Sequence, residues 1–138
     1  MKRLSILAGA CAMLAACGGG TSTGGKTVAI CTTMLSGDAE VESDLSARDM
    51  SVADYCACYA EGLNAQSAED KAAILKVTQI LADLREERGL GLEEAADLLD
   101  DSGAEAEFSL TRAEFETAGE YVDTIRRDLV RDEGLCAS

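Results

Sequence analysis

The chain has 138 residues, and its 26 acidic side chains outnumber its 12 Lys and Arg side chains, for a formal charge of −14. This length leaves room for one small domain and excludes a multidomain enzyme. Hydrophobic residues make up 47% of the chain but aromatic residues only 4%, which favours helices and excludes collagen-like and fully disordered chains. The sequence contains no His, so the usual Ser-His, Cys-His and His-metal sites cannot form within this chain.

The N-terminal segment has the three features of a secretory signal peptide. Lys2 and Arg3 are basic, residues 4–16 form an apolar stretch without a charge, and small residues follow. This stretch is shorter than the roughly 20 residues that a membrane-spanning helix needs. We therefore expect residues 1–16 to be a signal peptide that is removed on export.

The end of this leader, Leu14-Ala15-Ala16-Cys17, resembles the lipobox of bacterial lipoproteins. The resemblance implies cleavage before Cys17 and attachment of fatty acyl chains such as palmitate to its sulfur, which anchors the protein stably in a membrane. It also implies a place in the bacterial cell envelope, and Gly18 after the cysteine favours the outer membrane, facing the periplasm. Cys11 is a weaker site because its apolar lead is shorter. The alternative is an unmodified Cys17 behind a soluble secretory signal.

A glycine-rich segment follows the expected anchor. Residues 17–27 are expected to contain the lipidated Cys17 and a flexible linker, and residues 28–138 to form the helical domain. Residues 20–27 also match the phosphate-binding pattern G-x-x-x-x-G-K-[ST]. A working phosphate loop needs a buried strand before it, whereas here Cys17 lies three residues upstream. The linker interpretation is therefore preferred.

Four cysteines remain after the leader and Cys17 are set aside, namely Cys31, Cys56, Cys58 and Cys136. An even number in an exported protein indicates two disulfides. Residues two apart on a helix point away from each other, so Cys56 and Cys58 are expected to bond elsewhere. Two pairings stay open: Cys31 with Cys56 and Cys58 with Cys136, which is slightly preferred, or Cys31 with Cys58 and Cys56 with Cys136. The alternative is a Cu or Zn site or a thiol-redox pair at Cys56 and Cys58.

Helical periodicity predicts four helices, over residues 51–64, 67–88, 92–101 and 111 to about 131. Ser51, Ser67 and Thr111 each precede an acid by three residues, which is an N-capping pattern. A short strand over residues 27–31 and a loop or irregular helix over residues 38–49 are also expected. The predicted fold class is all-α, a small four-helix bundle cross-linked by disulfides.

Two further groups of residues are candidates for binding. Acidic residues crowd the third predicted helix, and Asp97, Asp100 and Asp101 are a weak candidate for calcium, although a solvated acidic face is the simpler interpretation. Aromatic residues recur at helical spacing and either fill the core or line a ligand groove; they are Tyr55, Tyr59, Phe108, Phe115 and Tyr121.

These features predict a membrane-anchored envelope lipoprotein with a non-catalytic binding or structural role and no cofactor. Loss of Lys2 and Arg3 with the leader makes the mature chain more acidic still. This negative net charge disfavours binding to nucleic acid. It is compatible with binding to another envelope protein that has a basic surface. The alternatives are the Cu, Zn or thiol-redox site at Cys56 and Cys58 and weak calcium binding at the acidic cluster.

Overall fold

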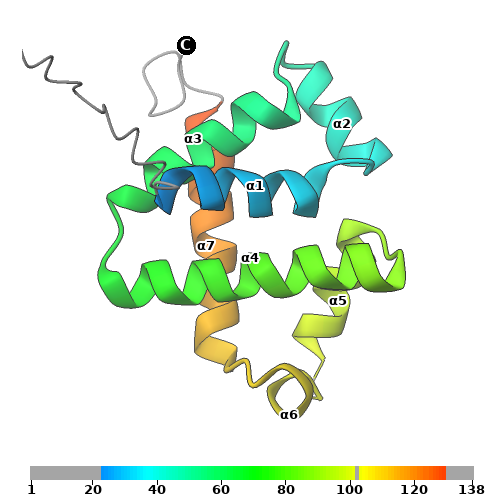
Figure 1. Cartoon of the computed structure of the whole chain (residues 1–138), viewed down its shortest axis with the longest axis vertical. Coiled ribbons are helices and arrows are strands. Elements are labelled where there is room, and N and C mark those ends of the chain that lie inside the picture. The colour runs from blue at the N-terminus through cyan, green and yellow to red at the C-terminus, as the bar shows by residue number, and fades with distance from the viewer. Residues whose placement is uncertain (1–22, 102, 130–138) are drawn as a thin grey trace, which may run out of the picture.

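The computed structural model describes residues 23–101 and 103–129, and this part of the chain is helical without any strand (Figure 1). Its helices are α1 (Thr23–Leu35), α2 (Ala39–Ser46), α3 (Val52–Asn64), α4 (Ala68–Arg88), α5 (Leu92–Asp100), α6 (Ala104–Phe108) and α7 (Arg112–Asp128). The all-α class is confirmed. The expected number of four helices is too low, because seven form in the described residues.

Four of these helices, α3, α4, α5 and α7, are the predicted ones. Three of them begin at the predicted caps, where Ser51, Ser67 and Thr111 each accept a hydrogen bond from the backbone N–H three residues on. Gly89 ends α4 in the left-handed conformation at φ +66°, which glycine adopts without strain. Local capping chemistry therefore fixes these boundaries.

Helix α1 corrects two expectations. Residues 23–27 were expected in the linker before a helical domain of residues 28–138, but they belong to helix α1, and residues 27–31 form no strand. Thr27, Cys31, Met34 and Leu35 recur at helical spacing and are buried. The Thr32 hydroxyl donates to the Val28 carbonyl oxygen at 2.8 Å, so this β-branched residue satisfies its polar group inside the helix. The predicted leader, Cys17 and the rest of the linker lie outside the described residues.

Two short helices, α2 and α6, were not among the four predicted helices. Asp38 caps α2 by accepting from the Val41 N–H at 3.2 Å. This helix occupies most of the segment 38–49, which was expected to be a loop or an irregular helix. Helix α6 follows Gly103 and leads to Leu110, which is only 2% exposed. Both short helices bring one or more apolar side chains to the core.

The arrangement centres on α4. Helix α1 packs against α3 and α4, and α7 packs against α4 and also touches α3 and α5. In Figure 1, α1 and α4 run across the view one above the other, and α7 crosses behind them. None of the helices in the described ranges combines the length and apolar character needed to cross a membrane.

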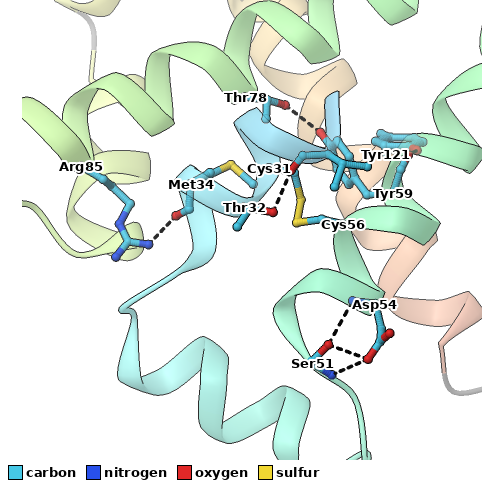
Figure 2. Close-up of a disulfide and its surroundings, with 11 residues drawn as sticks. Cys31, Thr32, Met34, Ser51, Asp54, Cys56, Tyr59, Thr78, Arg85 and Tyr121 are labelled. Carbon is cyan, nitrogen blue, oxygen red and sulfur yellow. Dashed lines mark hydrogen bonds between the residues drawn. A yellow bond between two sulfur atoms is a disulfide. The ribbon is translucent and has the colours of Figure 1, made fainter. Parts of the chain in front are cut away.

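The rings of Tyr59 and Tyr121 and the side chain of Thr78 lie together in the core (Figure 2). Tyr59 and Tyr121 pack edge to face with their ring centres 4.9 Å apart. The Tyr59 hydroxyl lies 2.7 Å from the Thr78 hydroxyl, which donates to the Ile74 carbonyl oxygen, so Tyr59 is the donor to Thr78. The Tyr121 hydroxyl donates to the Tyr59 carbonyl oxygen. These buried polar groups are therefore paired, as a stable core requires.

Candidate binding groove

The cysteines of α1 and α3 form a disulfide. Cys31 and Cys56 are bonded with their Cα atoms 5.6 Å apart, and neither side chain is exposed (Figure 2). This is the first bond of the preferred pairing. Cys58, two residues further along α3, is also disulfide-bonded and is buried, and its predicted partner Cys136 lies outside the described residues. In this state Cys56 offers no thiolate for a Cu or Zn ion or for a redox pair with Cys58.

The acidic cluster does not assemble a cation site. Among the described residues, no group of three or more His, Cys, Asp and Glu side chains is placed to hold a metal ion. Asp100 instead pairs with the Arg112 guanidinium, which also donates to the Glu116 carboxylate at 2.9 Å. The candidate calcium ligands Asp97, Asp100 and Asp101 are exposed and do not converge, so the calcium hypothesis is corrected.

A groove of about 740 Å³ opens between α2, α5 and α7, with residues of α1, α3 and α4 completing its lining. Buried side chains contribute to it, among them Leu45, Tyr55 and Val77. Half-buried apolar side chains line the rest: Val41, Leu81, Leu92, Phe115, Val122 and Leu129. The groove is thus a mainly apolar surface that the helices of the described residues, 23–101 and 103–129, leave partly uncovered.

The groove arises from the predicted apolar stripes. On α4 and α7 the stripe residues Ile74 and Ile125 are fully covered, whereas Leu81, Phe115 and Val122 on the same stripes are only half-buried. The neighbouring helices therefore cover only part of the apolar side of α4 and of α7. Because α2 has only 8 residues, it covers little of this apolar surface.

The five aromatic candidates divide between core and groove. Tyr59 and Tyr121 lie in the core away from the groove, Tyr55 is buried in the core at the floor of the groove, and the half-buried Phe115 lines it. Phe108 is half-buried and lies beneath the Arg88 guanidinium, 5.9 Å from the ring centre to the guanidinium carbon. The core interpretation is confirmed for the tyrosines, whereas binding of a ligand in the groove stays a prediction.

The rim of the groove is acidic. Five exposed carboxylates line it, those of Glu40, Asp44, Glu93, Glu94 and Asp123, together with the exposed guanidinium groups of Arg48 and Arg126. Within the described ranges, none of these five carboxylates forms a salt bridge. The rim therefore presents a net negative potential around an apolar surface.

Asp38 joins α2 to α5 at one edge of the groove. Its carboxylate accepts from the Leu92 N–H at 2.9 Å, at the start of α5, and from the Val41 N–H in α2. The bond from Leu92, aided by Arg85, holds the pKa of Asp38 below its ordinary value against the opposing effect of burial. The carboxylate therefore stays ionised at neutral pH and fixes both helices.

Arg85 completes this edge from α4. Its guanidinium lies 3.8 Å from the Asp38 carboxylate and donates to the carbonyl oxygens of Met34, Ser36 and Leu90. Figure 2 shows its side chain reaching toward Met34 at the end of α1. Local sequence patterns do not predict these contacts, since Asp38, Met34 and Ser36 are distant from Arg85 in the chain. Together, Asp38 and Arg85 set the positions of α1, α2 and α5 around the groove.

The groove presents apolar side chains with negative charge at the rim. In the part of the chain that the structure describes, every buried side-chain nitrogen or oxygen has a hydrogen-bond partner. A surface of this kind binds apolar or amphipathic partners, whose polar parts remain at the rim.

Comparison with profiles of protein families, with curated proteins and with solved structures finds no match for this chain. The groove, the disulfide and the leader sequence are the features from which its function can be inferred.

Proposed function

We propose that this protein is a lipid-anchored protein of the bacterial cell envelope that acts by binding or as a structural component. The observation that carries the proposal is the leader sequence, in which Lys2, Arg3, the apolar residues 4–16 and Cys17 occur in the order of a lipoprotein signal. The buried Cys31–Cys56 disulfide supports it, because such bonds persist in oxidising compartments outside the cytoplasm. Gly18 after the anchor favours the outer membrane, facing the periplasm.

In the proposed arrangement the helical domain lies close to the membrane. Helix α1 begins at Thr23, so only residues 17–22 separate the anchor from the domain. Six residues span at most about 20 Å when extended. The linker is therefore shorter than the sequence alone suggested, and the domain can reach only partners near its own membrane.

The proposed domain is held by two disulfides. Cys31–Cys56 joins α1 to α3, and we propose Cys136 as the partner of Cys58. The second bond would tie the C-terminal segment to the same helix. Thiol counting on the unreduced mature protein tests this: no free thiol is expected, whereas reactive thiols at Cys56 and Cys58 would instead favour the metal or thiol-redox alternative.

Intact-mass measurement of the membrane fraction tests the anchor. We expect a chain that begins at Cys17 and carries fatty acyl groups, and a mass increase of four hydrogens on reduction. Cys17→Ser should abolish acylation, whereas the matched change Cys11→Ser, within the leader, should leave the mature product unchanged. An unprocessed chain in the cytosol with its leader intact would contradict the proposal.

Separation of the two membranes tests the sorting step. Gly18→Asp should move the acylated protein from the outer to the inner membrane while its mass changes only by the substitution. The same distribution for both forms would contradict the outer-membrane assignment and leave the lipid anchor intact.

A further inference from the structure

We infer that the groove between α2, α5 and α7 binds an amphipathic helix with basic flanking residues, supplied by another protein of the envelope. The location of the partner in the envelope rests on the proposed function. The chemistry of the partner is inferred from the groove itself. The groove has a volume of about 740 Å³ and a mainly apolar lining. Five carboxylates stand on its rim beside two guanidinium groups, and none of the five is in a salt bridge within the described residues.

The apolar lining fits one face of a helix. Val41, Leu81, Leu92, Phe115 and Val122 come from four helices and are all half-buried, so each retains apolar surface that a partner could cover. A helix that enters such a groove places side chains at positions i, i+3, i+4 and i+7 against it and keeps its polar face in water.

The charge of the rim selects a cationic partner. Glu93 and Glu94 stand on α5, Asp123 stands on α7, and Glu40 and Asp44 stand on α2, so acids border the groove on its three sides. Lys or Arg residues that flank the apolar face of a helix would meet them. Fatty acids and anionic lipids would be repelled by the same carboxylates.

Other occupants fit the groove less well. A small polar ligand would need a fixed polar group inside the groove, whereas buried polar atoms in the described ranges are already paired. A second copy of this chain would bring another acidic protein to an acidic rim, because the chain has a net charge of −14. A cationic amphipathic helix satisfies both the apolar surface and the rim.

Gly119 provides a way to close the groove without disturbing the fold. It lines the groove from α7, is exposed, and has no atom within 4 Å of the position where a Cβ would be. Gly119→Leu therefore adds an apolar side chain over the groove and replaces a poor helix former. Ala113→Leu, on an exposed part of α7 that does not line the groove, is the matched control.

The probe is a synthetic helix of about 15 residues with Leu at positions i, i+3, i+4 and i+7 and Lys elsewhere. Its binding is measured by fluorescence anisotropy on mature lipidated protein in phosphatidylcholine vesicles, with the signal of empty vesicles subtracted. We expect Gly119→Leu to weaken binding about tenfold or more and Ala113→Leu to leave it unchanged. The thermal unfolding curves of both variants are recorded to show that they fold.

A second pair of variants tests the rim. Asp44→Lys with Asp123→Lys should weaken binding of the Lys-rich helix about tenfold, and added salt should reduce the difference. Glu61→Lys with Glu86→Lys makes the same change in net charge at exposed positions outside the groove and should have little effect. A scrambled isomer of the helix and a version with Glu in place of Lys should not bind to the wild-type protein.

Several outcomes would overturn the inference. These are equal binding by wild type and Gly119→Leu, binding of the Glu-containing helix or of dodecanoate in preference to the Lys-rich helix, and a dimer of the wild type that Gly119→Leu converts to monomers. The test is independent of the anchor: acylated Cys17 without helix binding would refute only the inference about the groove. Helix binding by a chain that proves to be unprocessed in the cell would refute only the proposed location.

Discussion

Arg85 joins segments that are distant in the sequence, because its guanidinium contacts Asp38, Met34 and Ser36. Its side chain is only 10% exposed and contacts three carbonyl oxygens and the Asp38 carboxylate, which is 13% exposed. By contrast, Arg112 pairs with two carboxylates but is 60% exposed. Charged hydrogen bonds contribute much more when water is excluded from them, so these two arginines should differ sharply in their effect on stability.

We predict that Arg85→Met lowers the free energy of unfolding by about 3 kcal/mol, because the Asp38 carboxylate and the part-buried carbonyl oxygens of Met34 and Leu90 lose a donor that is largely shielded from water. Arg112→Met is the matched control and should leave the urea midpoint nearly unchanged. Urea unfolding followed by circular dichroism measures both. Equal midpoints for the two variants would contradict the role given to Arg85.

The three tyrosines of the chain are all buried, and this gives a prediction for alkaline pH. Burial raises the pKa of Tyr59 to about 12 and also raises the pKa of Tyr55 and of Tyr121 above the ordinary value near 10. The folded state therefore favours the neutral phenols. The stability that this contributes is fully present below about pH 10 and is lost as the pH rises toward the folded pKa values.

Ultraviolet titration measures this effect directly. We expect no phenolate absorbance near pH 10 in the folded protein and ionisation of all three tyrosines near pH 10 once urea has unfolded it. A tyrosine that ionises near pH 10 in the folded protein would show that its ring is not in the core.

At the scale of the helices, the residue at which a helix ends depends on local backbone conformation. Gly89 ends α4 at φ +66°, whereas Gly119 lies inside α7. Neither has an atom within 4 Å of an added Cβ, so space does not distinguish them. Only the backbone conformation differs, and a residue with a Cβ is strained at a positive φ and favoured inside a helix.

We predict opposite effects of the same substitution at these two glycines. Gly89→Ala should lower the free energy of unfolding by about 1 kcal/mol, and Gly119→Ala should raise it by about 0.5 to 1 kcal/mol. Each variant serves as the control for the other in urea unfolding. A change of the same sign at both positions would contradict the assigned backbone conformations.

At the scale of the whole molecule, the Cys31–Cys56 disulfide links two helices that also share the core with α4. It closes a loop over a sequence separation of 25 residues. A cross-link of this size limits the unfolded chain and stabilises the fold by about 3 kcal/mol on the chain-entropy estimate. For a domain this small, that is a large part of the total stability.

We predict that replacing both Cys31 and Cys56 with Ala lowers the free energy of unfolding by about 3 kcal/mol and leaves the helix content unchanged. Urea unfolding measures the loss, and far-ultraviolet circular dichroism measures the helix content. Wild-type protein reduced and alkylated in urea should refold to no greater stability than the double variant. An unchanged urea midpoint would show that the disulfide does not stabilise the folded state.

The sequence by itself determined the all-helical class, four helices and the N-terminal caps of three of them, because a cap such as Ser51 with Asp54 involves residues only three apart. It also indicated the bond between Cys31 and Cys56. It did not predict α1 correctly, since the glycines and β-branched residues there favour a linker and a strand when taken locally. These residues form a helix because Thr27, Cys31 and Met34, which share one side of it, are buried against other helices.

Only the tertiary structure decided the groove. Leu81, Leu92 and Phe115 belong to apolar stripes that look alike in the sequence, and their half-exposure depends on where the neighbouring helices end. The bond from the Leu92 N–H to Asp38 spans 54 residues, so no local pattern could predict it. Capping and periodicity act within a few residues and can be read from the chain, whereas a binding surface consists of what the packed helices leave uncovered.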